Sequence, residues 1–413
     1  MASSTVIPMP LRMPLRVPDW QPPAKCQFAV ERQPMSITIV RSAAELAEHQ
    51  TAWEDLARHA IEANVFYEPW MFLPEWELLG RSEDLRCVLI YTTGPSNEGS
   101  PKLLAGFFPL ERARGYKGLP VTYTQLWRTP HISLCTPLIR ADYARDCLNA
   151  FFDWVGEASE SGSLLALPYL SGDGLFNQLL TDYTNDCPNL FTIEERTNRA
   201  LLTRSANSED YLSLALSGKR RKELRRQEKL LRELGEVEYV EFRPGDEVEW
   251  WLEQFLSLEA HGWKGAEGSA LGKHHETREL FLRTMRAAAA RGRLLMLALH
   301  LNGRPIAMKC NVQAGVGAFS LKIAYDEAYA SYSPGVHLEL ENVRRFHEHP
   351  QLQWMDSCAT SRHFMINRLW TARRSLKRIV IATGKGGGNF IVAALPLLRW
   401  YKRKFKVAPP SEE

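Results

Sequence analysis

The second half of the chain carries carboxylate, thiol and imidazole side chains at positions that suit proton transfer. Glu259 lies near the end of a predicted helix, and Asp356, Cys358 and His363 follow a predicted strand. A carboxylate can take a proton from an attacking amine or hydroxyl, and an imidazole or a thiol can protonate a leaving group. We therefore expect Glu259, Asp356 and His363 to be catalytic. A Cys358–His363 nucleophile pair and a packed cysteine beside a surface histidine are the alternatives for that segment.

A glycine-flanked segment, Glu259-Ala-His-Gly-Trp-Lys-Gly265, continues from the predicted catalytic glutamate. It places a large aromatic ring, Trp263, and a cation, Lys264, in the loop where the helix ends. Large aromatic side chains in such loops favour a role in covering a ligand or another element. We expect Trp263, Lys264 and Cys358 to bind the substrate, and a purely structural corner is the alternative for this loop.

The run Ala324-Tyr-Asp-Glu-Ala-Tyr-Ala-Ser-Tyr-Ser-Pro-Gly-Val-His337 joins a predicted strand to a predicted helix. The proline at 334, followed by glycine, favours helix initiation at this point. Backbone N–H groups of a first helical turn lack intrahelical partners and attract anions. The sequence therefore indicates an anion site at this helix start, of a kind that can hold a pyrophosphate.

Residues 219–233 are typical of a basic amphipathic helix, with eight basic and three acidic residues. Its apolar stripe consists of Leu224, Leu230, Leu231 and Leu234. Gly235 is a suitable residue to end this helix. A solvated helix face, a binding surface for a phosphate or an anionic substrate, and a nucleic-acid surface are the three interpretations of this charge.

The total charge of +3, from 51 basic and 48 acidic residues, conceals an uneven distribution. Residues 368–406 hold eleven basic and no acidic residues. Within them, residues 399–406 interleave cations with aromatic rings, a pattern compatible with an anionic membrane surface. A basic terminal tail without a partner is the alternative. Polyanionic ligands are therefore expected beside residues 219–233 or 368–406.

Metal chemistry is not indicated by the spacing of potential ligands. The seven cysteines are dispersed without CxxC spacing, and the histidines at 274, 275, 347 and 349 lack suitable partners. Gly384-Lys-Gly-Gly-Gly388 lacks the Gly-Lys-Ser/Thr order of a phosphate-binding loop and is interpreted as a flexible loop. We expect no metal, mostly buried free cysteines and a reducing, cytoplasmic compartment.

The elements that must position these residues fall into two similar sets, each with two helices, three meandering strands, a helix and a further strand. Antiparallel strands followed by a strand–helix–strand crossover predict an α/β fold with a mixed, mainly antiparallel sheet flanked by helices in each domain. Asn302-Gly303 predicts a tight hairpin between two of the strands. The expected divisions are a disordered, proline-rich tail at 1–36 without a secretory signal, domains at 37–200 and 201–398, and a basic tail at 399–413.

Three of these segments together resemble the GNAT-type acyltransferase family associated with cellulose and exopolysaccharide biosynthesis. The matching segments are Gly218-Lys-Arg-Arg-Lys-Glu-Leu-Arg-Arg-Gln-Glu228 with its Leu-Gly235 end, Glu259-x-x-Gly-Trp-Lys-Gly265, and Tyr325-Asp-Glu-x-Tyr-x-x-Tyr-Ser-Pro-Gly335. Their order and spacing agree with the family over residues 200–395, and the first half resembles the degenerate first domain of such proteins more loosely.

The resemblance implies two GNAT-like folds, as in the Fem-type peptidoglycan aminoacyl transferases. It also implies acetyl-CoA or another acyl-CoA, bound at a splayed strand with its pyrophosphate on loop amides. The cofactor-binding residues it implies are Tyr325, Ser333, Pro334, Gly335 and Val336. The sequence has Tyr-Ser-Pro-Gly where GNAT proteins commonly have Arg/Gln-x-x-Gly-x-Gly/Ala. It also has Ser357-Cys-Ala-Thr-Ser-Arg-His363 where relatives carry Gly-x-x-x-Tyr-Lys, so the acceptor pocket is expected to differ.

The expected function is acyl-CoA-dependent transfer to an amine or hydroxyl of a small molecule or glycan precursor, in cell-envelope or exopolysaccharide metabolism. A Fem-type transferase that uses aminoacyl-tRNA is the first alternative, motivated by residues 219–233. A non-catalytic accessory subunit of a polysaccharide-synthesis complex is the second, motivated by residues 368–406. The expected location is the cytoplasm, with peripheral contact to the inner face of the membrane through residues 399–406.

Overall fold

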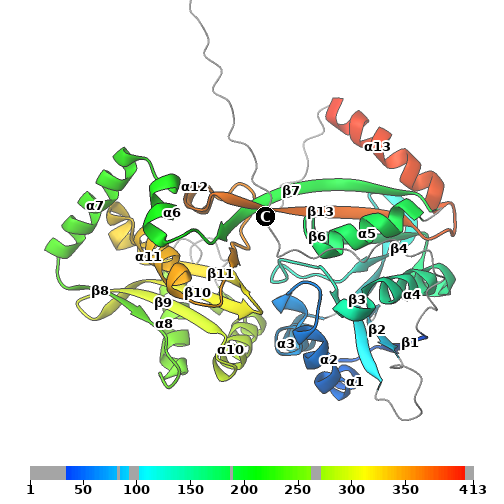
Figure 1. Ribbon diagram of the computed structural model, residues 1–413, viewed down its shortest axis with the longest axis horizontal. Coiled ribbons are helices and arrows are strands. Elements are labelled where there is room, and N and C mark those ends of the chain that lie inside the picture. The colour runs from blue at the N-terminus through cyan, green and yellow to red at the C-terminus, as the bar shows by residue number, and fades with distance from the viewer. Residues whose placement is uncertain (1–33, 81–83, 93–101, 187–188, 262–270, 405–413) are drawn as a thin grey trace, which may run out of the picture. The chain divides into compact units, whose positions relative to one another are not determined.

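The computed structural model describes residues 34–80, 84–92, 102–186, 189–261 and 271–404. In this part of the chain, thirteen strands form one mixed sheet that helices flank (Figure 1). The strands pair in the order β1-β2-β3-β4-β6-β13-β7-β12-β11-β10-β9-β8, and β5 pairs with β3. Their bounds are Met35–Val40 (β1), Leu85–Thr92 (β2), Leu103–Tyr116 (β3), Leu119–Leu126 (β4), Leu138–Ile139 (β5), Leu164–Ser171 (β6), Phe191–Thr203 (β7), Val237–Glu241 (β8), Leu294–Leu301 (β9), Arg304–Ala314 (β10), Gly317–Tyr325 (β11), Trp354–Asp356 (β12) and Ala372–Ala382 (β13).

The helices are distributed over both halves, and short 3-10 segments occur at several turns. The α-helices are Ala43–Glu48 (α1), Gln50–Arg58 (α2), Pro69–Leu79 (α3), Ala144–Glu157 (α4), Leu175–Asp186 (α5), Ser208–Ala215 (α6), Gly218–Glu233 (α7), Val248–His261 (α8), His275–Ala290 (α10), Pro334–Glu348 (α11), Phe364–Leu369 (α12) and Gly388–Lys404 (α13). The 3-10 segments are Val65–Tyr67 (η1), Ala141–Tyr143 (η2), Ser159–Ser161 (η3), Leu271–Lys273 (η4) and Glu327–Tyr332 (η5).

The two halves repeat one topology. In the first half β2, β3 and β4 form an antiparallel meander, and β6 returns parallel to β4 after α4. In the second half β9, β10 and β11 form the meander, and β12 returns parallel to β11 after α11. The β9–β10 turn has Asn302 at φ 52° and Gly303 at φ 73°, which is the left-handed backbone that a tight hairpin of this type needs. The predicted duplication and hairpin are therefore both present.

Two long strands connect the halves, and they differ from the predicted organisation. The boundary predicted between residues 200 and 201 falls inside β7. Most of β7 pairs with β13, while Leu201–Thr203 pairs with β12 of the second half. The predicted domain at 201–398 includes β13, but this strand lies between β6 and β7 of the first half. Figure 1 shows β7 and β13 running side by side from one half into the other.

The ends of the described chain also differ from the predicted boundaries. The strand β1 begins at Met35, inside the tail predicted for residues 1–36, and residues 1–33 lie outside the described part. Residues 399–404 are not a separate tail, because α13 continues through them. The helix is fixed to the sheet on one side by Val392 and Leu395, which are buried, and by Arg399, which donates to backbone carbonyls of β7.

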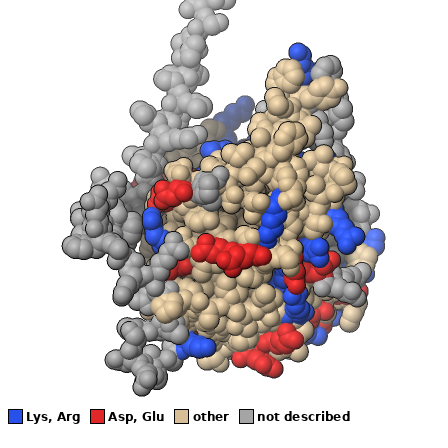
Figure 2. All heavy atoms as spheres, turned by 90° about the vertical axis from the view of Figure 1, so that its right-hand side faces the viewer, with Lys and Arg blue, Asp and Glu red and all other residues tan. Residues whose placement is uncertain are grey.

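The opposite side of α13 is apolar and exposed. Its exposed large side chains are Phe390, Leu397, Leu398, Trp400 and Tyr401, and the first of these is 80% exposed. In Figure 2 the tan projection at the upper right, where α13 lies, has few charged side chains other than a basic group at its tip. An exposed apolar and aromatic helix face is compatible with the membrane contact expected for residues 399–406, which stays a prediction. Among the described helices none is long and apolar enough to span a membrane.

The main hydrophobic core is shared by the two halves. One cluster of buried side chains contains Trp53, Phe72 and Phe107 from the first half and Phe255 and Met285 from the second. Helices α3 and α10 meet at this junction, and Arg283 of α10 pairs with Glu77 of α3 at 2.9 Å. The junction therefore holds side chains of both halves in a fixed arrangement around the site described next.

Candidate active site

A fork in the sheet defines the candidate active site. The parallel strands β11 and β12 are paired only at Gly317–Phe319 and Trp354–Asp356. Beyond Phe319 the strand β11 continues to Tyr325 beside β10, whereas the chain after β12 turns away. Cys358, two residues after β12, has a left-handed backbone with φ 52°, which marks this turn. The two strands thus separate like the arms of a V.

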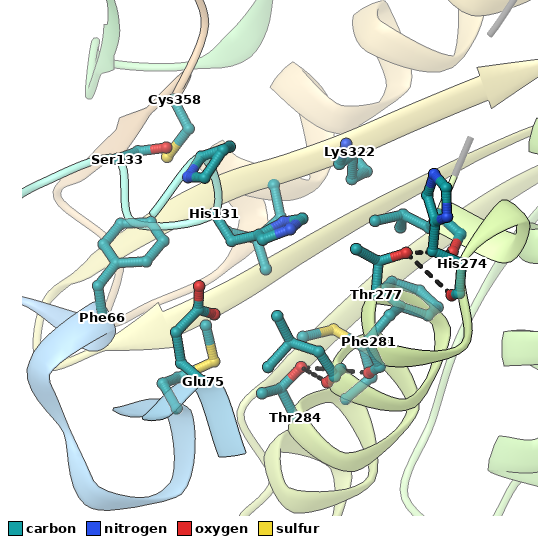
Figure 3. A pocket seen from close by; sticks show the side chains of 16 residues that line it. Phe66, Glu75, His131, Ser133, His274, Thr277, Phe281, Thr284, Lys322 and Cys358 are labelled. Carbon is teal, nitrogen blue, oxygen red and sulfur yellow. Dashed lines mark hydrogen bonds between the residues drawn. The ribbon is translucent and has the colours of Figure 1, made fainter. Parts of the chain in front are cut away.

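A cavity of about 340 Å³ opens at this fork, a volume near the small end of ligand-binding sites, roughly 300–1,000 Å³. Leu321 and Lys322 line it from one arm of the fork, and Cys358 lines it from the other. The first half of the chain supplies the facing wall, and α10 supplies the floor (Figure 3). The remaining lining residues are Phe66, Met71, Glu75, Pro130, His131, Ser133, Leu271, His274, Thr277, Leu280, Phe281, Thr284 and Met285.

Glu75 is the carboxylate of this cavity. It lies in α3, is only 4% exposed and accepts a short hydrogen bond from the Thr129 hydroxyl on Oε1. The same hydroxyl accepts the His131 N–H at 3.1 Å, so one threonine fixes both cavity residues. Burial raises the pKa of Glu75 to about 7. The hydrogen bond from Thr129 lowers this pKa, but by less than burial raises it. The carboxyl group therefore changes its protonation state near neutral pH.

This burial predicts a specific pH dependence of stability. A carboxyl group whose pKa is raised by folding stabilises the fold fully below its unfolded-state pKa, and loses that contribution as the pH rises through the folded-state value. For Glu75 the window runs from about 4.5 to about 7, which corresponds to roughly 3 kcal/mol. We expect Glu75→Gln to be more stable than the wild type by up to that amount at pH 8, and equally stable at pH 4. Urea unfolding of both proteins at the two pH values measures this difference, and a difference independent of pH would contradict it.

His131 and Cys358 are both uncharged at neutral pH. Burial, with the positive charge of Lys322 next in importance, lowers the pKa of His131 to about 4. Burial, with the Asp356 carboxylate next, raises the pKa of Cys358 to about 12. Cys358 is therefore a thiol and not a thiolate, so it is poorly suited to nucleophilic attack and retains a proton that it can donate.

Glu259, a predicted catalytic residue, lies behind the cavity wall. It is 1% exposed, and its Oε2 accepts the backbone N–H of Leu271 at 2.9 Å. Leu271 lines the cavity, and the charge of Glu259 acts on His131 by raising its pKa, against the effect of burial. Glu259 thus acts on the cavity indirectly: it holds the backbone of Leu271, which lines the cavity, and its charge acts on His131. Its catalytic role stays a prediction.

Asp356, the second predicted catalytic residue, is the centre of a buried ion cluster. Its Oδ1 lies 2.6 Å from Arg199 Nε, and its Oδ2 accepts from Arg199 Nη2 at 2.7 Å and from Arg374 Nη1 at 2.6 Å. The Cys358 N–H donates to Oδ1 at 3.0 Å. Burial raises its pKa, but the two guanidinium groups outweigh this and hold it below its ordinary value. A carboxylate bound in this way is a weak base, so the geometry favours a structural role at the fork.

The other predicted site residues are separated by the structure. His363 caps α12, where its Nδ1 accepts the Ile366 N–H at 3.4 Å, and it is not among the residues that line the cavity. Cys358 lines the cavity, and its predicted substrate-binding role stays a prediction. Trp263 and Lys264 lie in residues 262–270, outside the described residues.

The predicted donor-binding residues surround the start of α11, beyond the tip of β11. Ser333 has a left-handed backbone (φ 53°, ψ 49°) and precedes Pro334, the first residue of the helix. The carbonyl of Ser333 accepts the N–H groups of Val336 and His337 at 3.0 and 3.1 Å. A side chain at Gly335 would meet the ring of Tyr325 at 3.4 Å, so the helix start packs closely on the end of β11.

The basic helix α7 lies beside this helix start. Gln227 donates to the Ser331 carbonyl at 3.4 Å, and α7 packs on η5, which leads into α11. Burial lowers the pKa of His337, in the first turn of α11. The negative charge of Glu228 acts against this effect, and the positive charge of Arg220 adds to it. The predicted cationic segment and the predicted anion site are therefore neighbours in space.

Sequence analysis did not identify Glu75, His131 and Lys322 as site residues. Glu75 follows Pro74 in a run of aromatic and apolar residues, and its side chain is buried, whereas that of Glu77 on the same helix is exposed. A glutamate in such a run is unusual, because buried carboxylates are rare unless they are paired. That signal could have identified Glu75, whereas the approach of His131 and Lys322 depends on how the two halves meet.

The second half of the chain matches a known domain family. Residues 218–364 match the acetyltransferase (GNAT) domain, from the start of α7 to the start of α12, and so include both arms of the fork. This part of the chain thus matches a GNAT-type acetyltransferase domain, which supports an acyltransferase. No curated protein sequence is significantly similar to the chain.

Solved structures share the fold at low sequence identity. FemX superposes with a TM-score of 0.52 at 10% identity, over 80% of this chain and 95% of FemX. A tandem GNAT protein from the clavulanic acid biosynthesis pathway gives a TM-score of 0.41 at 12% identity, over 85% of this chain and 100% of that protein. A conserved protein of unknown function from Bacteroides thetaiotaomicron gives a TM-score of 0.49 at 12% identity, over 84% of this chain and 99% of that protein. These similarities concern the fold, and the predicted α/β fold with two GNAT-like parts is confirmed.

Among the described residues, no group of three or more His, Cys, Asp or Glu side chains could hold a metal ion. Five of the seven cysteines are described; these are free, and all but Cys358 are buried. The GNAT fold in general uses an acyl-CoA as co-substrate.

Proposed function

We propose that the protein transfers an acyl group from an acyl-CoA, held at the fork between β11 and β12, to an amine or hydroxyl acceptor in the cavity. The observation that carries this proposal is that the cavity opens where the two strands part, with Lys322 on one arm and Cys358 on the other. A donor lying in the fork would present its thioester to the cavity. The acceptor would approach from the side of the first half.

The charges around α11 support a phosphate-bearing donor. Proline has no N–H group, and the N–H groups of Val336 and His337 donate to Ser333, so few amides of this turn are left for an anion. The adjacent cations of α7 compensate for this, because its basic side chains are largely exposed and near the helix start. A coenzyme A molecule carries several phosphate charges, which such a surface attracts.

The proposed reaction requires two proton transfers at the site. A base must remove the proton that the acceptor loses, and the thiolate of the departing coenzyme A must gain one. Cys358 holds a proton at neutral pH and lies on one arm of the fork, so it can protonate the leaving thiolate. Asp356 fixes this arm by accepting the Cys358 N–H while it is itself held by two arginines.

The donor site is tested by a pair of substitutions at Ser333. Asparagine and aspartate both tolerate the left-handed backbone at this position, and both are good residues before a helix start. Ser333→Asp adds a negative charge beside the proposed pyrophosphate, whereas Ser333→Asn adds none. Isothermal titration with acetyl-CoA is expected to show a Kd at least about fivefold weaker for Ser333→Asp, since like charges at this range repel by about 1–4 kcal/mol. The asparagine variant is expected to bind as the wild type does, and equal binding by both variants would contradict the placement.

A Fem-type reaction with aminoacyl-tRNA is the second candidate, favoured by the exposed cations of α7 and by the FemX-like fold. Addition of deacylated tRNA to the same titration separates the two: competition at physiological salt supports the tRNA donor, and unaffected acetyl-CoA binding removes it. The GNAT match favours an enzyme over a non-catalytic accessory subunit. The association with cellulose or exopolysaccharide biosynthesis stays a prediction from the sequence motifs.

A further inference from the structure

The acidic residues of α3 and its flank differ in a way that singles out Glu75. Glu68, which precedes the helix, accepts from Arg293 and from Trp70, and Glu77 pairs with Arg283 at 2.9 Å. Both of these carboxylates thereby connect the two halves. Glu75 lies between them in sequence, and its hydrogen bond comes from a neutral hydroxyl, that of Thr129. Its carboxylate points into the cavity (Figure 3).

A buried carboxylate without a counter-charge lowers the stability of the folded state. Removal of an ionised group from water is unfavourable by several kcal/mol unless a counter-charge compensates it. Neighbouring His131 does not supply that charge, because its imidazole is neutral at pH 7. A glutamine would fill the same space and keep the Thr129 contact without this cost. The presence of glutamate at this position therefore indicates a function in the cavity.

The walls around Glu75 indicate what the cavity accepts. Phe66, Leu280 and Phe281 present apolar surface. The hydroxyls of Thr277 and Thr284, on the same helix, are engaged by backbone carbonyls of their own segment. The floor of the cavity is therefore effectively apolar, and one carboxylate stands at its edge. Such a site suits a molecule with an apolar body and a single amino group.

We propose that Glu75 is the catalytic base for an acceptor that carries a primary amine on an apolar body, with the amine at Glu75 and the body against α10. This inference rests on the proposed acyl-transfer function. The ammonium form of the acceptor loses one proton to solvent, and its nitrogen attacks the thioester carbonyl carbon. The C–N bond forms and the C–S bond breaks, and the coenzyme A sulfur leaves with the electron pair. Glu75 takes the second proton from nitrogen, and the thiolate gains one from Cys358 or solvent, so that an amide and free coenzyme A result.

The decisive experiment is a pH profile of acetyl transfer from acetyl-CoA to phenethylamine, for the wild type, Glu75→Gln and Glu77→Gln. For the wild type, kcat/KM is expected to rise about a hundredfold per pH unit below pH 7, because Glu75 and the amine must each lose a proton, and about tenfold per unit above pH 7, where only the amine titrates. Glu75→Gln is expected to be about 10²–10⁴-fold slower and to lose the steeper limb below pH 7, keeping only the tenfold slope of the amine. Glu77→Gln, the same substitution two residues away on an exposed carboxylate, is expected to follow the wild type.

The apolar body is tested by comparing phenethylamine with methylamine. Burial of an aromatic ring contributes about 1.5–3 kcal/mol, so phenethylamine is expected to have a kcat/KM at least tenfold higher. Equal values for the two amines would overturn the assignment of the α10 wall. Absence of acetyl transfer to phenethylamine, in a protein that binds acetyl-CoA, would overturn the substrate class.

Failure of this inference and failure of the proposed function give different results. If acetyl-CoA does not bind the wild type by calorimetry, the proposed function is wrong. If acetyl-CoA binds and phenethylamine is acetylated, but Glu75→Gln keeps both the rate and the steeper limb below pH 7, the inference alone is wrong. A structural role for Glu75 would lower the rate without removing that limb, which is the outcome that the pH profile separates from catalysis.

Discussion

Replacement of Asp356 by asparagine is expected to destabilise the protein by about 3–5 kcal/mol, the usual effect of removing one partner of a buried ion cluster. The substitution keeps the shape of the side chain but leaves the guanidinium groups of Arg199 and Arg374 without their shared counter-charge. Arg199 is buried, and Arg374 is largely so with its guanidinium 4.4 Å from the centre of the Trp354 ring. Arg199 therefore has no access to water where it lies in β7. Urea unfolding at pH 7 measures the loss.

Two further variants make this result interpretable. Asp182→Asn removes a carboxylate from an exposed pair, which is 3.9 Å from Arg145, and is expected to change stability by less than about 1 kcal/mol. Addition of Arg374→Met to Asp356→Asn removes one of the stranded charges and is expected to recover part of the loss. A loss below about 1 kcal/mol in Asp356→Asn would show that the cluster does not hold the fork together, and would reopen the catalytic role predicted for this residue.

The second large loss of stability is expected on replacement of Lys309, whose side chain lies beneath α11. Its ammonium group is 2.8 Å from Glu339 Oε2 and donates to the Ser320 hydroxyl at 2.7 Å, and both charged residues are buried. Glu339 also accepts from Trp370 and from Asn342 at 2.9 Å each. This network joins β10, β11 and α11, and so fixes the helix whose start is the proposed donor site. Lys309→Met is expected to cost about 3–5 kcal/mol, because it leaves the Glu339 carboxylate buried without a cation.

The double variant Lys309→Met with Glu339→Leu separates charge from packing. When both charges are replaced by apolar groups of similar size, stability is expected to return to within about 1–2 kcal/mol of the wild type. Denaturant midpoints of the two single variants and the double variant measure the coupling between the residues. Additive losses in the double variant would show that the two side chains contribute by separate contacts instead of as a pair.

Much of the fold follows from local sequence patterns. The Asn302-Gly303 pair predicted the β9–β10 hairpin, because a tight turn depends on near neighbours in the chain. The position of β13 could not be predicted in this way. A strand pattern shows that a segment is extended but not which strand it joins, and β13 pairs with β6, more than 200 residues earlier. The same limit put the predicted boundary between residues 200 and 201 inside β7, which pairs mainly with the remote β13.

The start of α11 was predictable from the sequence, and the cavity was not. Ser333, Pro334 and Gly335 are consecutive residues, so the helix start is visible in the sequence, and the anion site predicted there stays a prediction. The cavity instead depends on α3 meeting α10, which brings Glu75 opposite side chains some 200 positions away. Asp356 looked like a candidate base because its arginine partners are also remote. Only the folded arrangement shows that they hold its charge.

The central claim is that the acyl-CoA lies in the fork between β11 and β12 with its thioester at the cavity. The most direct measurement is a crystal structure of the wild-type protein grown with acetyl-CoA. In that structure we expect the thioester between Lys322 and Cys358, the pyrophosphate at the start of α11 beside α7, and an acetyl group that faces Glu75. Acetyl-CoA bound away from this fork, or a fork left empty at saturating acetyl-CoA, would contradict it.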